Sequence, residues 1–117
     1  MSNNTTHQIS LEQAVEMTSR YRENRPANFP LYETFERQAI DRLLATAGCE
    51  YLRIYYGMKA DMQADAILVA VDANNQDILP TSQTTTAEQL SADDDPIVVE
   101  DGYRCPQFCP SNSPLNP

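Results

Sequence analysis

The stretch CEYLRIYYGMKADMQADAILVAV, residues 49–71, decides the fold, because here the apolar pattern changes to the alternation of a β-strand. The first half places three apolar residues on one face of a predicted strand: Leu52, Ile54 and Tyr56. Tyr51, Arg53 and Tyr55 fall on the other face. Ala66–Val71 is a second strand that is apolar on both faces, and the polar run KADMQAD connects the two. This pattern predicts a β-hairpin.

Two helices are predicted before the hairpin. Ser10-Leu-Glu-Gln13 fits a capping box, in which the Ser10 and Gln13 side chains bind each other's backbone amides, and Pro26 ends this first helix. The second helix is predicted from about Glu33 to Ala47 by its wide apolar stripe: Phe35, Ala39, Ile40, Leu43, Leu44 and Ala47. Gly48 stands where a left-handed C-cap is expected.

A third strand is predicted at Pro96–Glu100, after a polar loop over residues 80–96. Helices followed by strands predict an α+β fold, with two N-terminal helices packed on a three-stranded antiparallel meander in two layers. The expected organisation is a flexible tail at residues 1–8, a single domain at 9–110 and a proline-rich C-terminal tail at 111–117.

The net charge of −9 over 117 residues argues against nucleic acid and anionic membranes as partners, because like charges repel. The chain has neither an apolar run long enough to span a bilayer nor the pattern of a signal peptide. A cytoplasmic location is therefore expected, and with it reduced thiols.

The chain offers few groups for catalysis. Its single histidine, His7, lies in the polar N-terminal segment, and its three glycines are too scattered to form a phosphate-binding loop. No catalytic residue and no cofactor are therefore predicted. The acidic residues Asp93, Asp94 and Asp95, with Glu100 and Asp101, are a candidate for collecting a divalent cation, but the composition favours a solvated acidic loop.

Arg53 is the candidate for binding a ligand, because Tyr51 and Tyr55 flank it on one strand face. An arginine stacked between aromatic rings is able to hold an anion. An ordinary ion pair or cation–π contact on the sheet is the favoured interpretation.

The segment RCPQFCP, residues 104–110, carries two of the three cysteines, Cys105 and Cys109. Their spacing fits half of a zinc site, for which Cys49 is a further candidate ligand; a disulfide and a rigid structural tail are the alternatives. The structural tail is favoured. The prediction is that both cysteines are reduced and metal-free, and that residues 103–110 lie along the sheet or at a dimer seam, with Phe108 buried there.

Three segments together resemble a group of small bacterial proteins: LRIYYGM, ILVAVDANNQDIL and YRCPQFCPSNSPLN. In that group a helix, an RIYYG-like strand, a VDANG-like turn and a terminal CPxxC…SPLN-like segment follow in this order. The likeness covers most of residues 10–117, with Asn75 in place of the usual glycine of the turn. The group has no assigned activity, so the resemblance implies no functional residue.

Apolar residues on both faces of a small sheet call for a covering partner. The favoured function is a non-enzymatic interaction or structural domain that associates with itself as a homodimer. The alternative is a small-ligand sensor, or a thiol- or metal-dependent enzyme, that uses Cys105 and Cys109 together with Arg53.

Overall fold

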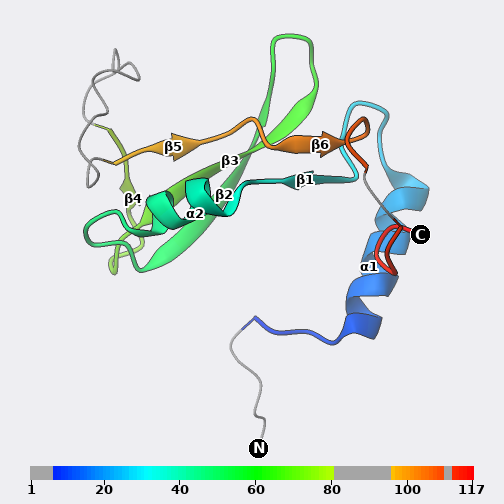
Figure 1. The fold of residues 1–117 in the computed structure, drawn as a ribbon, viewed down its shortest axis with the longest axis horizontal. Coiled ribbons are helices and arrows are strands. Elements are labelled where there is room, and N and C mark those ends of the chain that lie inside the picture. The colour runs from blue at the N-terminus through cyan, green and yellow to red at the C-terminus, as the bar shows by residue number, and fades with distance from the viewer. Residues whose placement is uncertain (1–6, 81–95, 110–111) are drawn as a thin grey trace, which may run out of the picture.

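The computed structural model describes residues 7–80, 96–109 and 112–117 of the chain (Figure 1). Two helices and six strands lie within these ranges: α1 (Leu11–Asn24), β1 (Tyr32–Thr34), α2 (Arg37–Leu44), β2 (Tyr51–Met58), β3 (Ala64–Val71), β4 (Asp77–Ile78), β5 (Val98–Val99) and β6 (Tyr103–Cys105). The α+β class is confirmed. Residues 1–6 of the predicted tail, residues 81–95 of the predicted loop and Asp93–Asp95 of the acidic run lie outside the described residues.

The predicted hairpin is confirmed and forms the centre of the fold. β2 and β3 pair antiparallel without interruption from Tyr51↔Val71 to Met58↔Ala64. β4 and β5 also pair with β3, so the main sheet has four strands and not the three that were expected. The additional strand β4 has only two residues, too few for a recognisable alternation in the sequence.

The first helix begins as predicted. The Gln13 amide donates to Ser10 Oγ and the Ser10 amide donates to Gln13 Oε1, each at 3.0 Å. The helix ends at Asn24, two residues before Pro26, and none of its residues is buried. α1 lies to one side of the four-stranded sheet, beyond the end of the β1–β6 pair (Figure 1).

The second helix is shorter than predicted, because its expected first turn is extended. Tyr32–Thr34 form β1, which pairs antiparallel with β6 at Tyr32↔Cys105 and Thr34↔Tyr103. α2 therefore begins at Arg37, and it packs on β3 and β5. Gly48 has the predicted left-handed conformation, with φ of 84°, but in the turn that follows the helix.

A small core lies between α2 and the sheet. Its buried members are Leu43, Leu68, Ala70, Ile97 and Val99. Phe35, Ala39, Ile40, Cys49 and Ile78 pack around them. In the described part of the chain nine apolar residues are buried, whereas seventeen large apolar side chains are exposed. Among the described residues, more large apolar side chains are therefore exposed than apolar residues are buried.

The C-terminal segment corrects the prediction made for its cysteines. Cys105 and Cys109 form a disulfide, so the prediction of a reduced pair is wrong. Phe108 is 54% exposed and contacts Tyr103 edge-on, with ring centroids 5.9 Å apart, so it is not buried against the sheet of the single chain. Its burial at a dimer seam stays a prediction. The chain then returns to α1, where Arg22 Nη1 donates to the Leu115 carbonyl at 2.7 Å.

Candidate functional site: an apolar groove beside a buried charge cluster

An apolar groove of about 900 Å³ lies on one face of the β2–β3 hairpin. Alternate residues of the two strands form its floor: Leu52, Ile54, Tyr56 and Met58 from β2, and Ala64, Ala66 and Leu68 from β3. The paired positions place small alanines of β3 opposite large side chains of β2, as in Tyr56↔Ala66 and Met58↔Ala64. This difference in side-chain size hollows the face beyond the part that α2 covers.

The wall of the groove comes from the segment between α1 and β1. Tyr21, Phe29, Pro30 and Leu31 line it. Backbone hydrogen bonds hold this segment over the sheet: the Ala64 amide donates to the Asn28 carbonyl at 3.0 Å, and the Leu31 amide donates to the Cys105 carbonyl at 2.6 Å. The Tyr21 hydroxyl donates to the Pro30 carbonyl at 2.6 Å, which joins the end of α1 to the wall.

The β2 side of the groove is exposed to solvent. Tyr56 is 86% exposed, and the other floor residues of β2 are between 43% and 49% exposed. Tyr51 and Tyr55, on the opposite face of the strand, are exposed as well. Within the described residues β3 is the one strand that pairs with β2, so the second edge of β2 carries no strand there.

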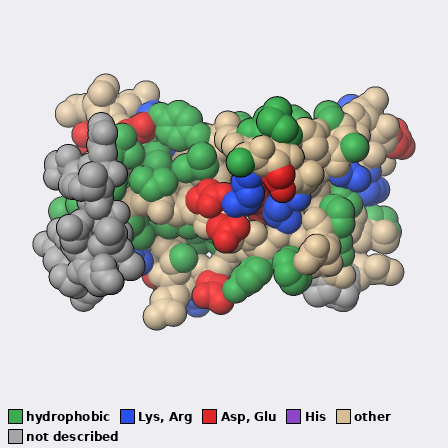
Figure 2. Space-filling view, turned by 90° about the horizontal axis from the view of Figure 1, so that it is seen from above, with side chains coloured by type: hydrophobic (Ala, Val, Ile, Leu, Met, Phe, Trp, Pro, Cys, Tyr) green, Lys and Arg blue, Asp and Glu red, His purple; other side chains and the backbone are tan. Residues whose placement is uncertain are grey.

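A cluster of charged side chains borders the groove at the end of the hairpin. Asp65 and Glu33 line the groove, and their side chains are only 2% and 6% exposed. Arg104 Nε lies 3.4 Å from Asp65 Oδ1 and 4.0 Å from Glu33 Oε2. In Figure 2, acidic and basic side chains gather near the middle of the face shown, with apolar side chains on both sides.

Arg104 joins three segments of the chain. Its guanidinium donates to the carbonyls of Ala64 (3.0 Å) and Asn28 (3.3 Å) and to Gln63 Oε1 (2.9 Å). The alternative function needs a positive charge beside the cysteines to activate a thiol, and Arg104 is next to Cys105 in the sequence. The guanidinium of Arg104 is instead engaged by the groove wall and by the start of β3.

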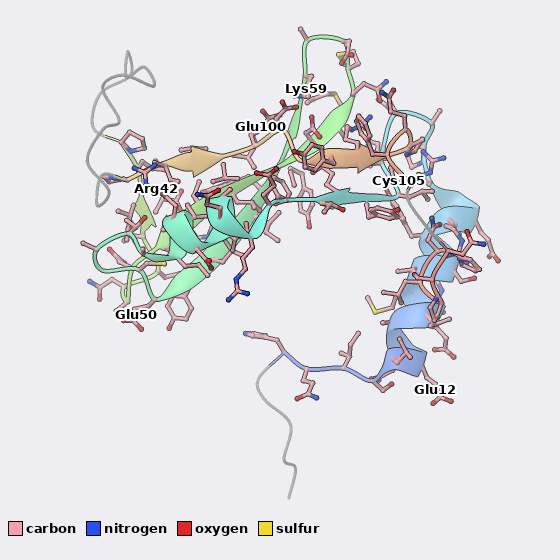
Figure 3. The ribbon with its side chains drawn as sticks, in the orientation of Figure 1. Glu12, Arg42, Glu50, Lys59, Glu100 and Cys105 are labelled. Atoms are coloured by element: carbon pink, nitrogen blue, oxygen red, sulfur yellow. A yellow bond between two sulfur atoms is a disulfide. The ribbon has the colours of Figure 1, made fainter. Side chains whose placement is uncertain are left out.

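Lys59 completes the cluster from the turn of the hairpin. Its ammonium lies 2.7 Å from Glu100 Oε2 and 3.2 Å from both Asp65 Oδ2 and Asp101 Oδ1. Figure 3 shows Lys59 and Glu100 side by side above the sheet. The hydrogen bonds to Glu100 and then Asp101 raise the pKa of Lys59, and burial together with Glu100 raises the pKa of the Asp65 carboxyl.

Arg53, the predicted anion-binding candidate, is held by its neighbours. Its Nη1 lies 2.6 Å from Asp77 Oδ1, and its Nη2 donates to Asn75 Oδ1. Tyr55 donates its hydroxyl to Asp77 Oδ2, whereas Tyr51 is exposed at the start of β2. The favoured interpretation, an ion pair on the sheet, is confirmed. This pair fastens the turn before β4 to β2.

The cysteines do not form the candidate metal site. The sulfurs of Cys105 and Cys109 are bonded to each other, so neither is a free thiolate. Cys49 is a free thiol that packs against the core beside α2 and contacts the Tyr51 carbonyl. Disulfides persist in oxidising surroundings, whereas the expected cytoplasmic location was linked with reduced thiols. The bonded pair therefore gives that location no support.

The sequence indicated part of this site. The alternation in residues 51–58 predicted which side chains share the groove floor. The charge cluster formed by Lys59, Asp65 and Arg104 was not predicted from the sequence. The first two lie in a segment predicted to be a polar connection, and Arg104 lies in the segment predicted to be a structural tail. One available signal was Asp65 itself, a carboxylate next to the apolar run that forms β3.

Comparisons with protein-family models, with curated proteins and with solved structures found no match to this chain. Among the described residues, no helix has both the length and the apolar character needed to cross a membrane. The groove, the β2 edge and the charge cluster are the features of this chain that bear on its function.

Proposed function

We propose that this protein is a non-enzymatic interaction domain that associates with itself through β2. The observation that carries the proposal is the surface of this strand: six of its eight residues are large, apolar and exposed, on both faces. Natural edge strands are usually protected by lysine, proline or a bulge. β2 contains no lysine and no proline, and its pairing with β3 runs without a bulge.

The charge distribution supports a second copy of the chain as the partner. A net charge of −9 opposes self-association in general, yet β2 contains no acidic residue. Its single charge, on Arg53, is paired with Asp77 of the same chain. Two β2 strands paired antiparallel at their open edges about a two-fold axis would extend the sheet and place their apolar faces side by side, without an uncompensated charge at the contact.

The weak docking of α1 agrees with the same interpretation. Leu11 and Met17 are 61% and 59% exposed, and the helix buries no residue in the single chain. An amphipathic helix normally buries its apolar face. A second copy paired to the open edge of β2 would continue the sheet whose groove is lined by Tyr21 of α1.

Light scattering coupled to size-exclusion chromatography tests the proposal over a series of protein concentrations. We expect a dimer for the unaltered protein. Leu52→Lys places a charge on the groove floor and should weaken the dimer by about tenfold or more, because the two-fold axis introduces two lysines into one contact. Leu79→Lys is the matched control, since Leu79 is 46% exposed against 43% for Leu52 and lies outside β2. It should leave the dimer intact.

Far-ultraviolet circular dichroism shows whether each variant is folded. A monomeric unaltered protein at the highest concentration would contradict the proposal. Equal dissociation by the two lysine variants would also contradict it, because the contact would then not be specific to β2.

The groove supports a second candidate function, the binding of an apolar small molecule. Its volume of about 900 Å³ is within the usual range of ligand pockets, and the Glu33 and Asp65 carboxylates supply the few polar groups that such pockets carry. Nile red, an uncharged apolar dye, is a suitable probe. Its fluorescence should rise with the unaltered protein and fall with Ala66→Phe, which fills the floor; an unchanged signal would exclude the groove.

A further inference from the structure

The turn region of the hairpin brings three carboxylates together. Oxygen atoms of Asp65, Glu100 and Asp101 all lie within 4.8 Å of one another. Asp65 belongs to β3, whereas Glu100 and Asp101 form the connection between β5 and β6. Three hard oxygen donors from two segments of the chain therefore converge on one point.

The buried member of this group has unused bonding capacity. The Asp65 side chain is 2% exposed, and neither of its carboxylate oxygens accepts a hydrogen bond within the described structure. Lys59 and Arg104 lie at 3.2 and 3.4 Å as ion pairs, without hydrogen-bond geometry. Buried carboxylates are normally hydrogen-bonded or coordinate a cation. Lys59 and Arg104 compensate the charge of Asp65 but do not satisfy its oxygens as hydrogen-bond acceptors, so these oxygens are available to coordinate a cation.

The charges of the cluster are also out of balance. Glu33, Asp65, Glu100 and Asp101 carry four negative charges, and Lys59 and Arg104 carry two positive charges. The Lys59 ammonium lies within 3.2 Å of an oxygen of each of the three converging carboxylates. It is 36% exposed and sits on a flexible stem at the turn of the hairpin, so it is able to leave toward solvent.

We propose that Asp65, Glu100 and Asp101 form a Ca²⁺ site, from which the ion displaces the Lys59 ammonium. Carboxylate oxygens are the ligands that Ca²⁺ and Mg²⁺ prefer. Ca–O distances reach about 2.6 Å, so two oxygens on opposite sides of one Ca²⁺ lie up to about 5 Å apart, and the three oxygens here lie within 4.8 Å of one another. Oxygens on one Mg²⁺ must approach within about 4.2 Å and in octahedral order.

The exposure of the donors completes the geometry. Glu100 and Asp101 are 36% and 77% exposed, so water has access to the remaining coordination positions. When Ca²⁺ replaces the Lys59 ammonium, a double positive charge takes the place of a single one, and the excess negative charge of the cluster falls. Because only three protein donors take part, the expected dissociation constant is in the range of about 10⁻⁴–10⁻³ M.

Isothermal titration calorimetry with CaCl₂ tests the proposal, with MgCl₂ and NaCl at matched ionic strength as separate titrations. The unaltered protein should bind one Ca²⁺ per chain, more tightly than Mg²⁺. Glu100→Gln with Asp101→Asn should abolish the saturable heat. Glu12→Gln with Glu50→Gln is the matched control, because it removes the same charge from two exposed carboxylates elsewhere (Figure 3). This control should bind Ca²⁺ unchanged.

Lys59→Met separates a cation site from a purely structural ion cluster. Removal of the competing ammonium should tighten Ca²⁺ binding by about tenfold or more, and Ca²⁺ should then raise the melting temperature of this variant more than that of the unaltered protein. A Lys59→Met protein that shows no saturable Ca²⁺ heat would overturn the proposal. Binding that persists in the Glu100→Gln, Asp101→Asn protein would also overturn it. If Lys59→Met does not fold, the comparison of the two double variants decides alone.

Discussion

Gly102 lies directly against the ring of Phe35, 67 residues earlier in the chain. A Cβ placed on Gly102 would lie 2.8 Å from Phe35 Cζ and 2.9 Å from Phe35 Cε1. Phe35 links β1 to α2 and packs against the core, whereas Gly102 links β5 to β6. This contact fixes the approach of the two-stranded pair β1–β6 to the main sheet.

Gly102→Ala should therefore destabilise the protein by about 1–3 kcal/mol, because the aromatic ring must move to admit the methyl group. Gly57→Ala is the control. Its Cβ would meet only Ile67, whose side-chain end is flexible, so a smaller loss is expected. Urea denaturation measures both free energies of unfolding, and equal losses would contradict the role given to the Phe35 contact.

Leu43 and Leu44 are neighbours on α2 with opposite environments. Leu43 is fully buried in the core, whereas Leu44 is 46% exposed. Leu43→Ala should cost about 2–5 kcal/mol, through lost burial and the cavity left behind. Leu44→Ala should cost much less, since part of its surface already meets water. Thermal and urea unfolding measure the loss of stability in each variant. A larger loss for Leu44→Ala than for Leu43→Ala would show that α2 is rotated about its axis.

The disulfide between Cys105 and Cys109 should be detectable in the mass and the thiol reactivity of the purified protein. The intact mass should lack the two thiol hydrogens of Cys105 and Cys109, and Cys49 alone should react with a thiol reagent in the folded, unreduced protein. Replacement of both bonded cysteines by serine should destabilise the chain by about 2 kcal/mol through the short closed loop, with a further loss because Cys105 is fully buried. Three reactive thiols before reduction would contradict the disulfide.

Tyr103 should titrate above its ordinary pKa of 10.0, because its hydroxyl donates a hydrogen bond to Glu36 Oε2 at 3.0 Å and the phenolate would face that carboxylate. The stability that this bond contributes is present below the ordinary tyrosine pKa and is lost as the pH rises through the raised value. The ultraviolet absorbance of phenolate follows the titration, with Tyr103→Phe as the reference. Glu36→Gln should lower the Tyr103 pKa, and no change would contradict the pairing.

The sequence by itself determined the elements that depend on local patterns. The capping box at Ser10 and the alternation of residues 51–58 each act within a few residues, so both are readable without knowledge of the rest of the chain. The same alternation predicted the apolar side chains that form the β2 half of the groove floor. The sequence also predicted that Arg53 makes an ordinary contact on the sheet, but it did not identify Asp77 as the partner in the ion pair.

Only the tertiary structure decided the features that join distant segments. β1 and β6 have three residues each, too few for a period. They form because their backbones meet across 69 residues at Thr34↔Tyr103 and 73 at Tyr32↔Cys105, which turns the expected first turn of α2 into a strand. The charge cluster gathers Glu33, Asp65 and Arg104 from three elements. Charged side chains carry no periodic signal, and their partners are selected by the position of the backbone after folding.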